Sequence, residues 1–211
     1  MAFITFEGIE GCGKTTQLQR LAGLLGPRAV TTREPGGTAI GRAVREVLLD
    51  PANRALEPTT ELLLYFADRA QNVAEVIRPA LTAGQVVLCD RHVESSLAYQ
   101  GYGRGLPLAA IRQLAALATG GLRPDAIVLI DVPVGVGLAR VGRRGAHDRL
   151  EREVLAFHER VRSGFAALLE EEPSRWLRLD GTAGEDVVFS ELVRGLSERG
   201  LVERGPAGAG A

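Results

Sequence analysis

The chain has 211 residues, of which 45% are hydrophobic and 24% are charged, and its formal net charge at pH 7 is -1. These values fit one globular domain with a sizeable core, and they lack the basic excess that a nucleic-acid or membrane partner would require. No apolar run reaches membrane-spanning length, and the two cysteines, Cys12 and Cys89, fit no disulfide framework, so we expect a cytoplasmic protein.

A phosphate-binding loop is the first informative stretch. Residues 8–15, GIEGCGKT, match the pattern G-x-x-x-x-G-K-[ST], between a β-rich run over 2–6 and leucines at helical spacing over 17–25. Glycines let backbone N–H groups converge on an anion, lysine reaches terminal phosphates, and a threonine hydroxyl is a ligand for Mg²⁺. We predict a nucleoside triphosphate site formed by Gly8, Ile9, Glu10, Gly11, Cys12, Gly13, Lys14, Thr15 and Thr16, and Lys14 is the only lysine of the chain.

A second strand over 29–32 leads into a loop, residues 33–38, with the sequence REPGGT. Pro-Gly-Gly ends the strand, so Arg33 and Glu34 are presented at a strand end, where open α/β sheets bind ligands. Taken alone, the segment is more typical of a surface turn. A helix follows, with Ile40, Val44 and Leu48 on one face, and ends near Asp50.

The next helix is expected to begin at a Thr59 or Thr60 cap and to continue to Ile77. Tyr65 and Arg69 are four residues apart and share one face, so together they could stack on and hydrogen-bond to a flat heterocycle. A core tyrosine beside a solvated arginine is the alternative interpretation.

The apolar run 85–89 predicts a buried strand with Asp90, Arg91 and His92 at its carboxyl end. Asp90 is positioned to hold Mg²⁺ together with Thr15, and Arg91 to bind a second phosphate through two oxygens. A plain surface ion pair is the alternative, and His92 is interpreted as structural. A helix start over 93–99 should be broken by a flexible loop over 100–105.

The remaining elements alternate in the same way. Helices are predicted over 109–118, 134–141, 151–171 and 187–196, and strands over 125–132 and 176–180. The segment over 142–150, which we call the lid, carries several arginines between glycines and suits closure over transferring phosphates, unless it is only a solvated basic loop. We expect one domain over 1–200 with a disordered tail over 203–211.

The alternation predicts a five-stranded parallel sheet flanked by helices, with a small lid. The chemistry is phosphoryl transfer or nucleotide binding. A GTPase is excluded, because an Asn-Lys-x-Asp motif needs a lysine other than Lys14 and no Asp is followed by Gly three residues later. A kinase for a small molecule and a non-catalytic ATP-binding module both stay open.

Five segments carry a family resemblance: FEGIEGCGKTT, REPGGT, LLLYFADRAQ, DRHVESSLAYQGYGRG and RRGAHDRLE. Their order and approximate spacing resemble those of the bacterial thymidylate kinases, over residues 1 to about 195. The resemblance implies a three-layer P-loop nucleoside monophosphate kinase fold, transfer of the ATP γ-phosphoryl to dTMP with Mg²⁺, and a homodimer. A kinase for another nucleoside monophosphate is the closest alternative.

The resemblance also implies roles for single residues. Tyr65 would stack on thymine, Arg69 would face the base, Arg91 would hold the dTMP phosphate, and Tyr99 would disfavour a ribose 2′-hydroxyl. The complete acceptor set it implies is Glu10, Arg33, Pro35, Tyr65, Phe66, Arg69, Arg91, Ser96, Tyr99 and Gln100. Because the phosphate loop has no arginine, the resemblance is to the type whose lid supplies it, so the catalytic set is Lys14, Arg91, Arg144 and Arg149.

Overall fold

The computed structural model describes residues 1–143 and 148–203. Arg144 and nearly all of the predicted tail therefore lie outside the described residues. Within the described residues, no helix has the length and apolar character needed to cross a membrane.

The strands of the described residues form one sheet in which all neighbours are parallel. They are β1 (Ala2–Glu7), β2 (Ala29–Arg33), β3 (Val86–Asp90), β4 (Ala126–Asp131) and β5 (Trp176–Asp180). Their order is β2-β3-β1-β4-β5, which confirms the predicted five-stranded parallel sheet. The chain runs from β1 to one edge and later to the other, so the carboxyl end of β1 lies at a topological switch point, where such sheets bind ligands.

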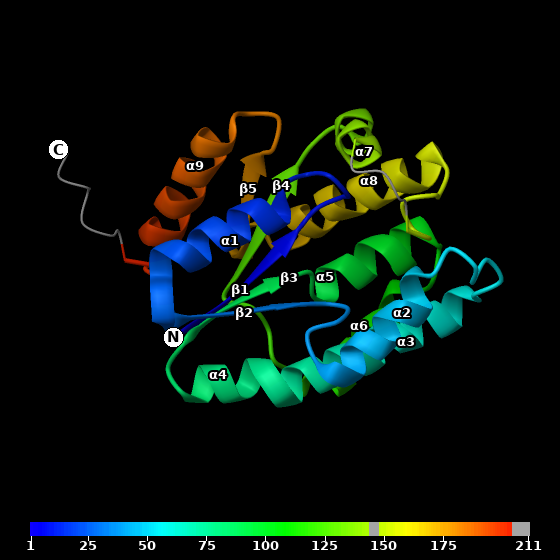
Figure 1. Ribbon diagram of the computed structural model, residues 1–211, viewed down its shortest axis with the longest axis horizontal. Helices are drawn as coiled ribbons and strands as arrows, with labels where there is room; N and C mark the ends of the chain where they lie inside the picture. Colours follow the sequence, from blue (N-terminus) through cyan, green and yellow to red (C-terminus); the bar gives the residue numbers. More distant parts are fainter. Residues whose placement is uncertain (144–147, 204–211) are drawn as a thin grey trace.

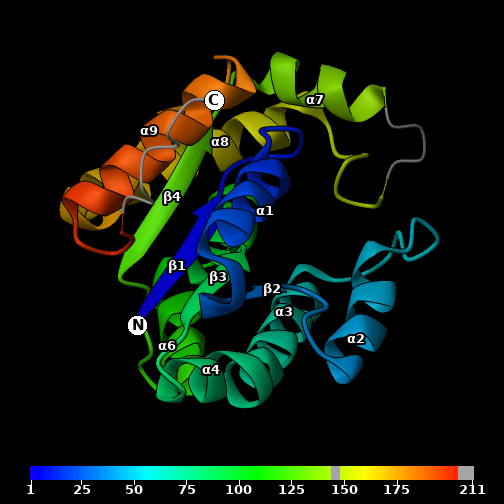
Figure 2. The ribbon, with the colours of Figure 1, turned by 60° about the vertical axis from the view of Figure 1, so that its left-hand side comes forward.

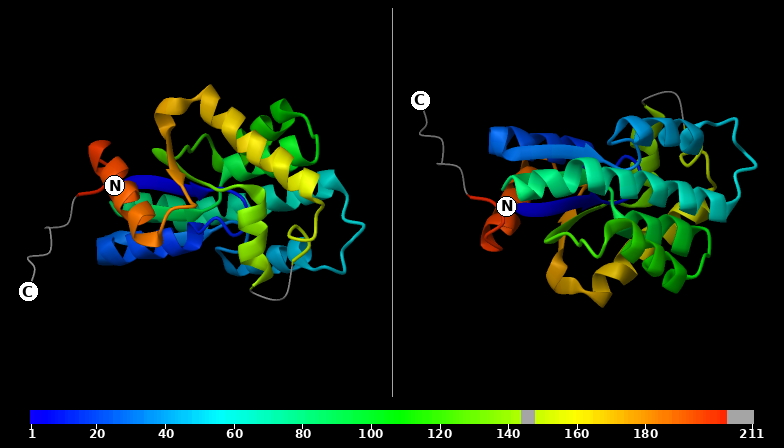
Figure 3. Two further views of the ribbon diagram at one scale, coloured as in Figure 1. Left: turned by 90° about the horizontal axis from the view of Figure 1, so that it is seen from above. Right: turned by 90° about the horizontal axis from the view of Figure 1, so that it is seen from below.

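Helices cover both faces of the sheet (Figures 1 and 3). The α-helices are α1 (Lys14–Leu25), α2 (Ala39–Leu49), α3 (Pro58–Asn72), α4 (Arg78–Thr82), α5 (Val93–Ser96), α6 (Leu108–Thr119), α7 (Val134–Gly142), α8 (Leu155–Glu171) and α9 (Glu185–Glu198). The described residues also form the π-helical segments η2 (Val73–Ile77) and η3 (Leu97–Gly103) and the 3₁₀ turns η1 (Gly26–Arg28) and η4 (Pro173–Arg175). Helices α1 and α9 pack together on one face, and α8 packs on η3 on the other.

The alternation of side chains along β1 explains why both faces are covered. Ile4 and Phe6 point into the larger apolar cluster, and Phe3 points into a smaller one that contains Val73 and Ile77 of η2. All six residues of β1 are buried, as a strand in the middle of a parallel sheet requires.

The prediction of a flexible loop over 100–105 is wrong, because the π-helix η3 continues through Gly103. The glycines were interpreted as helix breakers, but they allow close packing instead. A Cβ at Gly103 would lie 2.7 Å from the ring of Phe157, and one at Gly164 would lie 2.7 Å from Tyr102. The absence of these side chains lets η3 and α8 approach closely and holds Tyr99 and Gln100 in buried positions.

Two predicted helix starts are also corrected. The cap of α3 is Glu57, whose Oε2 accepts a hydrogen bond from Thr59 N at 3.0 Å, so neither threonine caps the helix. The helix predicted from residue 151 begins at Leu155. Asp148 Oδ1 accepts from the backbone N–H groups of Leu150 and Glu151, and this local turn separates the end of the lid from α8.

Candidate active site

A cleft of about 790 Å³ lies at the carboxyl ends of the strands. Its lining includes Arg45 of α2, Tyr65 of α3 and Arg140 of α7, and Figure 2 shows α7 across from α2 and α3. The phosphate loop after β1, the loop after β2 and the end of β3 form its floor. The fold therefore brings together the strand-end residues that the sequence singled out separately.

Two glycines set how closely the phosphate loop approaches α7. Gly11 has a φ of 70°, and a Cβ there would lie 2.2 Å from the carbonyl oxygen of Gly137. A Cβ at Gly137 would in turn lie 2.5 Å from the carbonyl oxygen of Glu10. The loop and the helix that leads into the lid are thus in backbone contact. Lys14 Nζ donates to the carbonyls of Gly8 and Ile9, at 3.1 Å each, within the loop.

The predicted metal residues lie side by side. Thr15 Oγ1, at the start of α1, donates to Asp90 Oδ2 at the end of β3, at 2.8 Å. A hydroxyl and a carboxylate oxygen are the hard ligands that Mg²⁺ prefers, and both residues line the cleft.

Arg91 joins the phosphate loop to α5 and η3. It is the one described non-glycine residue with a positive φ, at 71°. Its Nη1 donates to Gly8 O and Ser95 Oγ at 3.0 Å each, and its Nη2 donates to Glu10 Oε1 at 3.0 Å and to Tyr99 OH at 3.1 Å. The guanidinium is therefore held between the predicted donor and acceptor sides.

Glu10 is an ionised carboxylate in this arrangement. Tyr99 OH donates to its Oε1 at 2.5 Å, and its Oε2 lies 3.5 Å from His158 Nδ1. Burial alone would raise the pKa of Glu10, but His158, Arg91 and Lys14 lower it to about 2. Glu10 therefore offers a fixed negative charge between the two parts of the site.

A second, smaller cavity of about 20 Å³ adjoins the cleft. It is lined by Glu34, Tyr65, Arg69, Arg91, Ser95, Ser96, Tyr99, Gln100 and Leu150. Most of the predicted acceptor residues thus meet at one place, while Arg33 and Pro35 line the larger cleft beside it. Phe66 lines neither cavity, and its ring lies beneath Arg69, with 4.6 Å between the ring centroid and Arg69 Cζ.

Arg69 is buried, contrary to the interpretation of a solvated arginine. Its Nε donates to Glu34 Oε2 at 2.6 Å, its Nη1 to Ser96 Oγ at 3.1 Å and its Nη2 to the carbonyl of His92 at 2.7 Å. Burial would raise the pKa of Glu34, but His92 and Arg69 lower it to about 2. Sequence reasoning left Glu34 out of the site, although its place beside Arg33 in the strand-end loop was the available signal.

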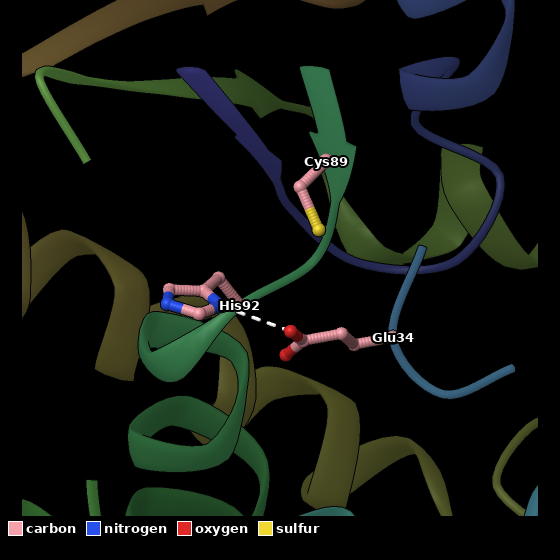
Figure 4. A group of neighbouring side chains, drawn as sticks. All are labelled: Glu34, Cys89 and His92. Carbon is pink, nitrogen blue, oxygen red and sulfur yellow. Dashed lines mark hydrogen bonds and ion pairs between the residues drawn. The ribbon is translucent and has the colours of Figure 1, made fainter. Parts of the chain in front are cut away.

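Glu34, Cys89 and His92 have ligand atoms that all lie within 4.8 Å of one another (Figure 4). Their contacts explain the group as an internal polar network. Glu34 Oε1 lies 3.1 Å from His92 Nδ1, and its other oxygen is held by Arg69. Burial raises the pKa of the Cys89 thiol, which donates to the carbonyl of Arg91 at 3.1 Å, whereas a metal would need the thiolate.

Of the two predicted lid arginines, the structure describes Arg149. Arg144 lies outside the described residues. Arg149 lines neither cavity; its Nη2 lies 2.5 Å from Glu61 Oε2, and its Nε donates to the carbonyl of Leu48 at 2.8 Å. Its assignment as a catalytic residue stays a prediction.

Two arginines outside the predicted catalytic and binding sets line the cleft. Arg140 Nη1 donates to Gly181 O at 3.0 Å and to Gly11 O at 3.4 Å, joining the phosphate loop to the segment after β5. Arg45 Nη1 donates to Pro35 O at 2.9 Å, and burial followed by the charge of Arg33 lowers the pKa of Arg45. Two neighbouring guanidiniums favour an anionic ligand. The position of Arg45 about two helix turns after the REPGGT loop was the only sequence signal.

Comparisons with known proteins agree on one family. The family model described as thymidylate kinase matches residues 6–192. A thymidylate kinase of Deinococcus radiodurans is 56% identical over 201 residues, covering 94% of this chain and 97% of the relative. One from Geobacter sulfurreducens is 53% identical over 206 residues, covering 93% and 97%. The crystal structure of thymidylate kinase from Ehrlichia chaffeensis has a TM-score of 0.76 at 34% identity and covers 92% of this chain and 98% of that one.

Proposed function

The chain belongs to the thymidylate kinase family, and on that premise we propose how its residues phosphorylate dTMP with ATP, giving dTDP and ADP. The observation that carries the proposal is the position of Arg91, which joins the phosphate loop to a second cavity lined by Tyr65, Arg69 and Gln100. A module that only binds ATP has no need of a second cavity beside its phosphate loop.

The phosphate loop binds the donor. Its backbone N–H groups and the start of α1 bind the ATP phosphates, and Lys14 neutralises the terminal ones. Thr15 and Asp90 fit Mg²⁺ because they bring a hydroxyl and a carboxylate oxygen to one point, 2.8 Å apart. Bound there, the ion would neutralise developing charge on the transferred group.

The smaller cavity binds the acceptor together with the part of the cleft that adjoins it, because a volume of about 20 Å³ has room for little more than one water molecule. Tyr65 stacks on the base, Arg69 and Gln100 face its polar edge, and Ser96 fixes Arg69 through their hydrogen bond. Arg91 holds the phosphate of dTMP, while Arg33 and Pro35 line the side nearest the donor. Ionised Glu10 accepts from a hydroxyl of the sugar, and Tyr99, bonded to Glu10, closes the space beside it.

In the transfer step, an oxygen of the dTMP phosphate forms a bond to Pγ as the bond from Pγ to the bridging oxygen of ADP breaks. Positioning and charge stabilisation contribute most of the catalysis. Lys14 and Arg91 supply charge from the two sides. Because Gly11 and Cys12 bring no arginine, we assign the remaining positive charge to the lid, with Arg144 and Arg149 as candidates.

We further propose that the protein is a cytoplasmic homodimer. Exposed apolar side chains on α2 and α3, Ile40, Val47 and Leu63, support an interface there. The free, buried thiols of Cys12 and Cys89 support a reducing compartment.

The proposal is tested with purified protein, ATP, MgCl₂ and dTMP, by following dTDP and ADP. The two products should form in equal amounts, and Lys14→Ala should lose most of the transfer while unfolding as cooperatively as the wild type. Release of ADP without dTDP would contradict the acceptor assignment. Wild-type rates in Lys14→Ala would contradict the role of the lysine.

A further inference from the structure

Glu61 of α3 is a fully buried carboxylate that neither cavity exposes. Its Oε1 accepts from Gln100 Nε2 at 2.8 Å and from Arg104 Nε at 3.3 Å. Its Oε2 accepts from Arg104 Nη2 at 3.1 Å and from Arg149 Nη2 at 2.5 Å. One carboxylate therefore joins α3, η3 and the end of the lid.

The charge of Glu61 determines which atom of Gln100 faces it. Burial alone would raise the pKa of Glu61, but hydrogen bonds from Arg104 and Gln100 and the charges of both arginines lower it, so the group is an ionised acceptor. An ionised carboxylate has no proton to donate, so the amide of Gln100 must direct its NH₂ group towards it. The opposite amide orientation would place two oxygens against each other.

The amide oxygen of Gln100 is thereby left for the acceptor cavity. Gln100 lines that cavity, and its hydrogen bond to Glu61 engages Nε2, which leaves Oε1 on the other side of the amide. Arg69, on the same wall, uses three of its five N–H groups within the protein, so the guanidinium retains donors for a ligand. The cavity wall thus offers one acceptor beside a donor.

Thymine and cytosine differ in whether their hydrogen-bonding groups are complementary to this pattern of one acceptor beside one donor. Thymine presents a ring N3–H donor next to a carbonyl oxygen, which matches an acceptor beside a donor. Cytosine presents an unprotonated N3 acceptor next to an amino donor, which opposes it at both positions. A buried site that hydrogen-bonds one group rejects an analogue that leaves its polar atoms unpaired.

We propose that Glu61 is a positioning residue for base specificity: it holds the Gln100 amide so that the cavity accepts a pyrimidine with a ring N–H and rejects cytosine. The inference rests on the proposed function. It assigns discrimination between acceptors to a residue that contacts no substrate, and it links this discrimination to Arg149 at the end of the lid.

The test compares kcat/KM for dTMP and dCMP in Glu61→Gln. A neutral amide at position 61 both donates and accepts, so Gln100 is free to turn its NH₂ towards the cavity. We expect kcat/KM for dTMP to fall about tenfold while kcat/KM for dCMP is retained or rises. An equal fall for both substrates, or an unchanged ratio in a folded variant, would overturn the proposal.

Glu153→Gln is the matched control. Glu153 Oε1 lies 2.6 Å from Arg104 Nη1, so the variant removes a second carboxylate from the same arginine without touching Gln100. It should leave the dTMP to dCMP ratio unchanged. A change equal to that of Glu61→Gln would mean that Arg104, rather than the orientation of the amide, determines the ratio.

A double-mutant cycle with Gln100→Leu tests whether Glu61 affects the dTMP to dCMP ratio through the amide of Gln100. In the Gln100→Leu background, Glu61→Gln should cause no further change in the ratio, because the amide is gone. Should Glu61→Gln fail to fold, Glu61→Asp keeps the charge for the arginines but withdraws it from Gln100, and the same change in ratio is expected. Failure of the wild type to phosphorylate dTMP would instead contradict the proposed function itself.

Discussion

Arg91 Nη2 lies 3.0 Å from Glu10 Oε1, so a strand-end arginine and a residue inside the phosphate loop form an ion pair between the two cavities of the site. Ser95 is a further partner of Arg91, and Tyr99 OH is hydrogen-bonded to both residues of the pair. The pair makes the geometry of the donor and acceptor sides interdependent.

Glu10→Gln should show how this ion pair contributes to stability. The pKa of Glu10 is lowered from 4.5 to about 2, so its stabilising contribution is complete above pH 4.5 and is lost as the pH falls towards 2. We expect the variant to be less stable than the wild type by on the order of a few kcal/mol at pH 7. Urea unfolding at pH 7, 5, 4 and 3 should show the difference shrinking below pH 4.5. A difference that stays constant over this range would contradict the assignment.

Glu7→Gln should behave in the opposite way. Burial, followed by the charge of Glu94, raises the pKa of Glu7 to about 8. Between pH 4.5 and 8 the unfolded chain releases a proton that the folded protein keeps, so Glu7 makes the protein less stable as the pH rises. As the pH rises through this window, the free energy of unfolding of the variant should therefore increase relative to that of the wild type by on the order of a few kcal/mol. Parallel stability curves for the two proteins would contradict the raised pKa.

Gly137→Ala should disturb the contact between the phosphate loop and α7. The added Cβ would lie 2.5 Å from the carbonyl oxygen of Glu10, so the loop must move. We expect a higher KM for ATP and a loss of about 1–3 kcal/mol in the free energy of unfolding. Gly135→Ala is the matched control in the same helix, because no atom other than those of its chain neighbours and the helix backbone lies within 4 Å of its added Cβ. That variant should keep full activity, and its free energy of unfolding should rise by up to about 1 kcal/mol.

Substitution of the two lid arginines should have different effects, on stability for Arg149 and on catalysis for Arg144. Arg149→Ala leaves Glu61 with one fewer partner and should cost about 1–3 kcal/mol in the free energy of unfolding. Arg144→Ala should lower kcat more than KM for dTMP if its charge acts mainly in the transition state. Thermal unfolding and steady-state kinetics on both variants measure this. A fall in kcat for Arg149→Ala at unchanged stability would assign the catalytic role to Arg149 instead.

The strands were predictable because apolar runs are local signals, and the proximity of Thr15 to Asp90 was predictable because the carboxyl ends of parallel strands lie at one edge of the sheet. Buried parallel strands are continuous apolar runs, and β1 and β4 have this pattern. Thr15 and Asp90 follow from the rule that ligands gather at carboxyl strand ends, and their hydroxyl and carboxylate are 2.8 Å apart.

The buried charge pairs between distant segments were not predictable. Glu34 with Arg69, and Glu61 with Arg149, are 35 and 88 residues apart, and no local pattern indicates which charges will be buried together. The helix η3 was missed for a related reason. Whether Gly103 breaks a helix or allows close packing depends on Phe157, which a single-sequence pattern does not place beside it.

The central claim is that the acceptor cavity selects dTMP. The most direct measurement is a competition, in which dTMP, dCMP, dGMP and UMP at equal concentration share limiting ATP and Mg²⁺, and the diphosphates are then separated. Because the substrates compete, the yields report the ratios of kcat/KM directly. We expect dTDP to form in large excess over every other diphosphate. Comparable yields of the four products would contradict it.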